Sequence, residues 1–134
     1  MMIRPFCCLA ALFVSASTLA GTVVYTDSAH PVPDGQDAPV VYLDAPELVQ
    51  TQIFGPLSSS PDQAERDARA VLSSSRFRQA ERQLADAYSG VTRAWSLGLE
   101  KYPAVVFDDQ FVVYGTTDVS LAMQRLSAWR EGQR

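Results

Sequence analysis

The sequence has 134 residues, of which 11 are basic and 15 acidic, so its net charge is −4. A chain of this length forms one domain with its own hydrophobic core, and an acidic balance with a single lysine disfavours direct contact with nucleic-acid phosphates. Its only two cysteines, Cys7 and Cys8, are adjacent, which excludes a disulfide framework spread along the chain.

Residues 1–20 have the pattern of a secretory signal peptide. Arg4 supplies a basic start, and residues 6–14 form a short apolar stretch. Residues 17–20, Ser-Thr-Leu-Ala, place small side chains three before and directly before a cut after Ala20. The apolar stretch is shorter than the roughly 20 residues of a membrane-spanning helix. We therefore expect a cleaved leader, export to the periplasm and a mature chain without a transmembrane segment. Both cysteines leave with the leader, and with them any thiol nucleophile or thiolate metal ligand.

Two apolar segments near the start of the mature chain are predicted to be strands. Thr22–Thr26 is rich in β-branched and aromatic residues, and Val40–Leu43 is a continuous apolar run typical of a buried strand. Between them, residues 27–39 contain three prolines, three aspartates and a glycine. That composition excludes a regular helix and predicts an irregular segment.

Residues 44–60 allow two interpretations. Pro46 lies near a possible helix start, which would open a short helix over Glu47–Phe54, and Gly55-Pro56 would end it. The same residues could instead form a binding loop, and the pattern does not decide between the two.

Residues 61–96 are predicted to form two helices. Ser60 before Pro61, with Gln63 three positions after the serine, is a capping-box pattern. The serines at 73–75 indicate a break, after which a second helix runs from about residue 76 to residue 96. Its apolar positions recur at steps of three and four, as a buried stripe requires: Phe77, Ala80, Leu84, Tyr88, Val91 and Trp95.

The end of the chain is predicted to be a β-hairpin followed by a helix. The apolar runs Ala104–Phe107 and Phe111–Tyr114 are separated only by Asp108-Asp109-Gln110, which favours a tight turn. Thr116 or Thr117 would then cap the last helix, with Asp118 near its positive end. The apolar face of this helix is predicted to consist of Val119, Ala122, Met123, Leu126 and Trp129 or Arg130, with Gly132 at its end.

These elements together predict an α/β fold. The tight turn makes the last two strands antiparallel, and the long helical crossover predicts that the strands on either side of it lie parallel. The result is a single domain over residues 21–134, in which helices pack on a four-stranded mixed sheet.

This arrangement resembles that of thioredoxin-like domains. In such domains a cis proline before the penultimate strand faces a Cys-x-x-Cys motif at the exit of the first strand. Tyr102-Pro103 stands at the place of that proline. The resemblance therefore implies a cis bond, although only about 5–6% of X-Pro bonds in folded proteins are cis. The first-strand exit, residues 25–33, contains no cysteine, so the resemblance implies the scaffold without the redox activity.

Three short motifs carry a more specific resemblance. They are Val-Val-Tyr-Thr-Asp at 23–27, Pro-Ala-Val-Val-Phe-Asp at 103–108 and Val-Val-Tyr-Gly-Thr-Thr-Asp-Val at 112–119. With them the chain resembles a family of small secreted proteins encoded on integrating conjugative elements. Members are similar in outline to the TrbC-type and TraW-type pilus-assembly proteins of conjugative type IV secretion. The resemblance implies a periplasmic part in building the mating-pair apparatus, with other periplasmic or outer-membrane components as partners and no cofactor.

Three functional hypotheses follow. The first is a non-catalytic docking module whose contact residues lie on the former active face of the thioredoxin scaffold: Tyr25, Asp27, His30, Tyr102 and Pro103. The second is a hydrolase that uses Asp27 and His30. Because His30 is the only histidine, a metal site of three or four ligands is not expected, and no nucleophile motif accompanies the pair. The third is a holdase that shields pilin subunits in an exposed apolar groove.

Overall fold

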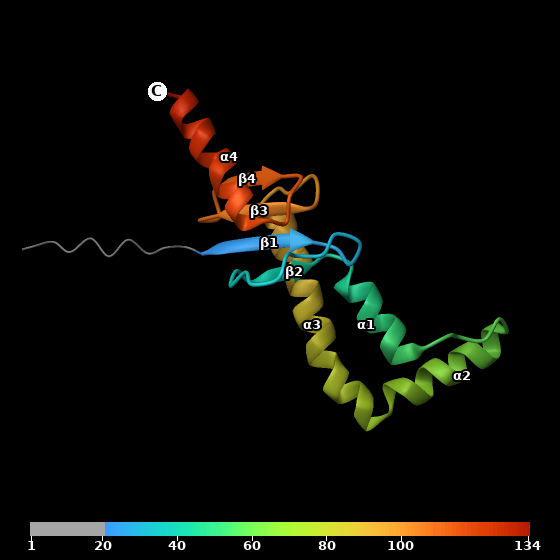
Figure 1. Ribbon diagram of the computed structural model, residues 1–134. Coiled ribbons are helices and arrows are strands. Elements are labelled where there is room, and N and C mark those ends of the chain that lie inside the picture. The colour runs from blue at the N-terminus through green and yellow to red at the C-terminus, as the bar shows by residue number, and fades with distance from the viewer. Residues whose placement is uncertain (1–20) are drawn as a thin grey trace, which may run out of the picture.

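The computed structural model describes residues 21–134, and the predicted signal peptide lies outside the described residues. Residues 21–134 form an α/β fold in which four helices accompany one mixed sheet of order β2-β1-β3-β4 (Figure 1). The strands are β1 (Thr22–Thr26), β2 (Val40–Tyr42), β3 (Ala104–Phe107) and β4 (Phe111–Tyr114). The helices are α1 (Ala45–Phe54), α2 (Pro61–Leu72), α3 (Ser75–Ser96) and α4 (Val119–Gly132). The predicted four-stranded mixed sheet is confirmed, and residues 45–54 are helical.

The strand directions correct one expectation. The parallel pair is β1 and β2, which the irregular segment connects, whereas β1 and β3 are antiparallel. The strands on either side of the helical crossover, β2 and β3, therefore run in opposite directions. The reason is that the helices leave and rejoin the sheet at the same end, where Tyr25 pairs with both Val41 and Ala104. A parallel arrangement would require the crossover to return along the full length of the sheet.

The sheet carries a hydrophobic core on each face because successive side chains of a strand alternate between faces. On one face Val24 and Val105 pack with Ala122 and Leu126 of α4, together with Val32 from the irregular segment. On the other face a second core contains Tyr25 and Val106 of the sheet and Ala94 of α3. The sheet thus lies between α4 and the carboxyl-terminal half of α3.

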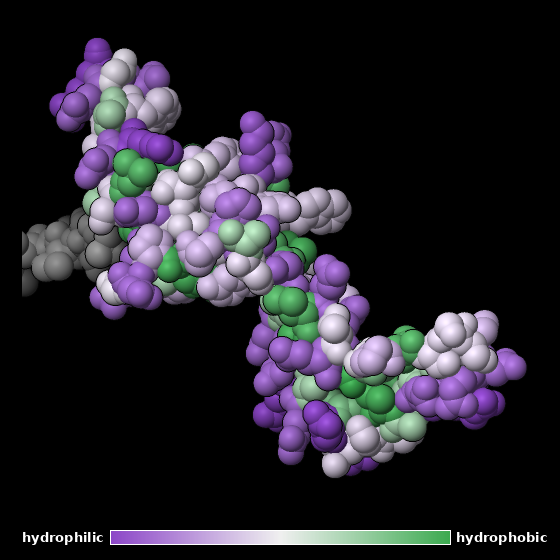
Figure 2. Space-filling model, turned by 45° about the vertical axis from the view of Figure 1, so that its right-hand side comes forward, coloured by the Kyte–Doolittle hydropathy of each residue, from purple (hydrophilic) through white to green (hydrophobic). Residues whose placement is uncertain are grey.

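Helices α1 and α2 and the first half of α3, residues 75–87, form a helical arm that projects away from the sheet (Figure 1). No residue of α1 or α2 is buried. In the space-filling view the arm is a second lobe, with apolar side chains showing along its inner side (Figure 2). Across residues 21–134, no helix combines the length and the apolar character that crossing a membrane would require.

The buried stripe of α3 corrects the predicted one at two positions. Phe77, Ala80, Leu84 and Val91 are partly buried as expected, but Ala87 and Ala94 complete the stripe. Tyr88 is 47% exposed and Trp95 84% exposed. The helix lies too close to the sheet for large side chains here. A Cβ atom on Gly90 would stand 2.7 Å from Cγ1 of Val41 in β2.

The turn of the hairpin adopts a backbone that aspartate tolerates well. Asp108 and Asp109 both have positive φ angles, 55° and 54°, in the left-handed region where Asn and Asp are enriched. The Gln110 N–H closes the turn by donating to the Phe107 carbonyl oxygen. The carboxylate of Asp109 also forms an ion pair with the guanidinium of Arg93, which joins the turn to α3.

The predicted caps of α4 and α2 are wrong in detail. Asp118, not a threonine, caps α4 by accepting a hydrogen bond from the Leu121 N–H. Thr117 instead donates to the Pro31 carbonyl oxygen, which holds the irregular segment against the start of α4.

At α2 the helix does begin at Pro61, but Ser60 makes no side-chain capping bond. The Gln63 amide donates to Asp67 rather than reaching back to Ser60.

On α4, the predicted apolar positions Met123 and Trp129 are both more than half exposed.

Candidate functional site

The loop after β1 is held in one conformation by its own side chains. The His30 N–H donates to Asp27 Oδ1 at 3.0 Å, and the His30 ring nitrogen Nδ1 lies 2.6 Å from the same oxygen. The hydroxyl of Thr26, a fully buried residue, donates to the His30 carbonyl oxygen at 2.8 Å. Both ends of the loop are thus tied down, and the His30 side chain is left half exposed.

Tyr102 and Pro103 lie beside this loop. The Tyr102–Pro103 peptide bond is cis, as expected. The rings of His30 and Tyr102 meet edge to face, with their centroids 6.4 Å apart and an interplanar angle of 74°. Tyr102 is 53% exposed. The residues Asp27, His30, Tyr102 and Pro103 therefore form one surface at the end of the sheet, here called the exit face.

Tyr25 is the one predicted contact residue that the structure places elsewhere. Its side chain is 2% exposed and belongs to the core that includes Val106 and Ala94. Burial raises the pKa of its hydroxyl, and the negative charge of Asp109 adds to that rise while Arg93 opposes it. Tyr25 therefore belongs to the core between the sheet and α3 and offers almost no surface to a partner.

Asp44 belongs to the same region but was not singled out from the sequence. It precedes α1 without capping it, because its carboxylate turns to the loop, where Oδ2 accepts the Ser28 N–H at 3.0 Å. The side chain and then the backbone N–H of Ser28 lower the pKa of Asp44. Its Oδ1 atom is buried with no hydrogen-bond partner. The Asp-Ala-Pro sequence at a helix start could have identified Asp44 as a cap position, but not its partner in the loop.

The contact between Asp27 and His30 has the geometry of the carboxylate–histidine pair that a hydrolytic triad would need. A carboxylate on Nδ1 of a histidine fixes the ring for a nucleophile at Nε2. Across residues 21–134, Asp27 is the only side chain hydrogen-bonded to the ring, and Ser28 contributes its N–H to Asp44 instead. The same described residues contain no group of three or more potential metal ligands. The exit face therefore presents an ordered histidine and tyrosine without an assembled catalytic triad.

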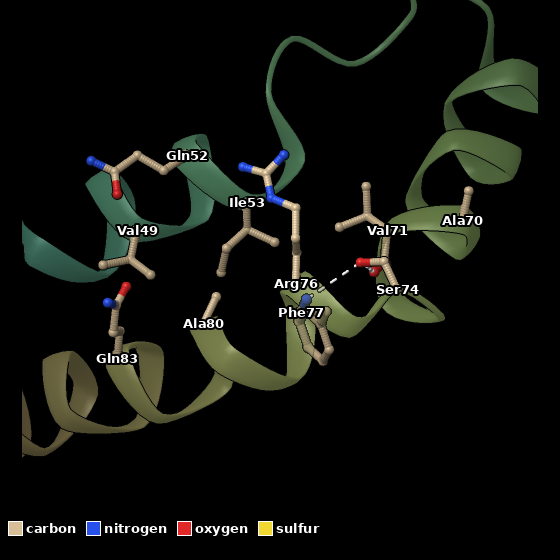
Figure 3. Close-up of a pocket in the computed structure, with 10 residues that line it drawn as sticks. All are labelled: Val49, Gln52, Ile53, Ala70, Val71, Ser74, Arg76, Phe77, Ala80 and Gln83. Atoms are coloured by element: carbon tan, nitrogen blue, oxygen red, sulfur yellow. Dashed lines mark hydrogen bonds between the residues drawn. The ribbon is translucent and has the colours of Figure 1, made fainter.

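A second concave feature lies in the helical arm. Side chains from α1, α2 and α3 surround an open pocket of about 420 Å³ (Figure 3). Figure 3 shows Val49 and Ile53 of α1 facing Ala80 of α3, with the Arg76 side chain extending toward α1. The serine that caps α3, Ser74, accepts the Phe77 N–H at the base of the pocket. Most of this lining is apolar, so the pocket suits an apolar occupant better than a charged one.

One comparison with known proteins yields a match. The family model described as "Protein of unknown function (DUF1525)" matches residues 19–132, nearly the whole described chain. No curated protein and no solved structure matches the sequence.

Proposed function

We propose that this chain, which belongs to the DUF1525 family, is a non-catalytic periplasmic component of a conjugative type IV secretion apparatus. In this proposal it helps to assemble or stabilise the mating-pair machinery through protein–protein contacts made by a thioredoxin-like scaffold. The motifs at 23–27, 103–108 and 112–119 support the proposal through their resemblance to proteins of integrating conjugative elements. The predicted signal peptide supports the compartment.

The observation that carries the proposal is the composition of the exit face. A thioredoxin-like redox enzyme needs thiols at this place, and residues 21–134 contain no cysteine. The residues at this place are His30 and Tyr102, whose rings meet edge to face and are both about half exposed. Hydrogen bonds to Asp27 and Thr26 fix the backbone of His30. Tyrosine on a pre-ordered backbone is a favoured anchor of protein interfaces because little conformational entropy is lost on binding. The exit face therefore fits docking better than chemistry.

The experiment is a pull-down from the envelope of donor cells with the mature chain as bait, combined with a mating assay. We expect the wild-type chain to recover a component of the secretion apparatus and the double variant His30→Ala, Tyr102→Ala to lose it. Tyr88→Ala is the matched control, because Tyr88 is a similarly exposed tyrosine on α3. Deletion of the gene should lower transfer frequency. Undiminished transfer, together with no apparatus component on the wild-type bait, would reject the proposal.

The pocket of the helical arm favours a second candidate, a holdase for pilin subunits. An open apolar pocket of about 420 Å³ between three helices could accept a hydrophobic segment of an unfolded chain. A holdase would suppress the aggregation of an unrelated reduced protein, and Ile53→Asp within the pocket would abolish that suppression. A docking module would not suppress this aggregation, and Ile53→Asp would then leave the result unchanged. An aggregation assay therefore separates the two functions.

A further inference from the structure

The open pocket in the helical arm, here called the arm pocket, has an apolar interior built by three different helices. Ile53 of α1, Val71 of α2 and Ala80 of α3 line it, and Figure 3 shows these side chains turned toward one shared space. Each of the three is only partly buried. Because covering such apolar surface is favourable, the arm pocket favours an apolar group as its occupant.

The arm pocket offers few hydrogen-bonding groups to a peptide. Its walls are helices, whose backbone N–H and C=O groups are mostly bonded within the helix. The Ser74 hydroxyl is also used, since it donates to the Val71 carbonyl oxygen at 2.6 Å and accepts the Phe77 N–H at 3.3 Å. A polypeptide segment in the pocket would therefore bury peptide groups without partners, which is costly. An alkyl chain carries no such groups.

The size of the arm pocket limits what it can hold. Its volume is about 420 Å³. Two turns of an α-helix with side chains, about 11 Å long and about 10–12 Å across, fill on the order of 900 Å³. At about 30 Å³ for a group the size of a water molecule, the pocket holds at most about 14 methylene-sized groups. It therefore matches one medium-length alkyl chain better than a helix of a partner protein.

Arg76 determines the charge that the occupant can carry. It is the one charged side chain among the described residues that line the arm pocket, and it is exposed, so it lies at the open side. Figure 3 shows it extending from α3 toward α1. Arg76 forms no ion pair with any other residue in the range 21–134. A carboxylate at the open side would accept charge-assisted hydrogen bonds from its guanidinium, whereas a cationic group would be repelled.

We propose that the arm pocket binds a single-chain fatty carboxylate of about 10–14 carbons. The alkyl chain lies among Ile53, Val71 and Ala80, and the carboxylate pairs with Arg76 at the open side. This occupant is an alternative to the unfolded chain considered above for the same pocket. The arm pocket shares no residue with the exit face, so this proposal and the docking proposal can each fail without the other.

The test titrates the mature chain with saturated carboxylates from hexanoate to tetradecanoate, each kept below the concentration at which it forms micelles. Methyl signals are followed by NMR. Those of Ile53, Val71 and Ala80 should shift, while that of Val24, buried in the sheet core, should not. Affinity should rise by up to about 4-fold for each added methylene, because burial of one methylene contributes about 0.8 kcal/mol. The rise should stop once the chain fills the pocket.

Variants separate the roles of charge and space. Arg76→Gln should weaken the binding of dodecanoate by about 3- to 5-fold, the usual range for an exposed ion pair. Arg78→Gln is the matched control and should leave the affinity unchanged, because Arg78 is exposed on the same turn of α3 but does not line the pocket. Ala80→Phe fills the interior and should abolish binding. Thermal unfolding establishes that each variant keeps its fold.

Three results would overturn the proposal. The first is the absence of a saturable shift of the three methyl signals at about 1 mM dodecanoate, since even weak specific complexes form at that concentration. The second is equal affinity for dodecyltrimethylammonium, which has the same chain length and the opposite charge. The third is a shift of the same signals by an unfolded, reduced protein but not by any carboxylate. In that case the occupant would be a polypeptide, as the holdase function requires.

Discussion

The close approach of α3 to the sheet predicts the outcome of a substitution at Gly90. A Cβ atom at this position would lie 2.7 Å from Val41 Cγ1, which is 0.7 Å inside the 3.4 Å at which ordinary contacts begin. Overpacking of this kind costs about 1–3 kcal/mol, whereas alanine is favoured over glycine within a helix by about 1 kcal/mol. The net effect of Gly90→Ala is the difference between these two contributions. The variant should therefore lower the free energy of unfolding by between about 0 and about 2 kcal/mol.

The double variant separates the two contributions. In the Val41→Ala background the clashing methyl group is gone, so Gly90→Ala should stabilise the protein by about 1 kcal/mol. The coupling energy between the two positions is then about 1–3 kcal/mol, measured by urea unfolding of the four proteins in a double-mutant cycle. Ser89→Ala, on the exposed neighbouring position, is the control and should show no coupling with Val41. A Gly90–Val41 coupling energy below about 0.3–0.5 kcal/mol, the usual limit for independent sites, would refute the packing argument.

Three further outcomes are expected. Asp118→Ala should lower the free energy of unfolding by about 1 kcal/mol because Asp118 caps α4. Ser60→Ala is the control and should have little effect, because Ser60 makes no capping bond. Equal effects of the two substitutions in urea unfolding would contradict the cap assignment. The pKa of Asp44 is lowered from the ordinary value of 3.8 in the folded chain, so its contribution to stability is complete above that pH and is lost as the pH falls through the folded pKa. Asp44→Asn should flatten this acid dependence, and an unchanged profile of stability against pH would count against the Ser28 contact. Tyr102→Ala should change stability by less than about 1 kcal/mol, since half of the ring is exposed; a larger loss by thermal unfolding would mark Tyr102 as structural.

Local signals in the sequence predicted much of the scaffold. Two apolar runs around an Asp-Asp turn were sufficient for both hairpin strands, because the turn leaves only one register that pairs the runs. Pro61 and the serines at 73–75 located the start of α2 and the break before α3. In each case the signal and the structure that it produces lie within a few residues of each other.

Features that depend on distant contacts were not predictable. Tyr88 and Trp95 follow the helical period as well as Ala87 and Ala94 do, and only the approach of β2 to Gly90 decides that the small residues face inward. The carboxylate of Asp44 meets Ser28 across 16 residues, and no periodic pattern reports such a contact. The direction of β3 relative to β2 likewise depends on where the helical arm rejoins the sheet.

Photo-crosslinking in donor cells tests the central claim most directly, because it records contacts of the intact chain in its own compartment. A photoreactive residue in place of Tyr102 should give one discrete adduct with an envelope component of the transfer apparatus. The same residue in place of Asp62, exposed on α2, should not. No adduct at position 102, or the same set of adducts from both positions, would contradict the assignment of the exit face as a docking surface.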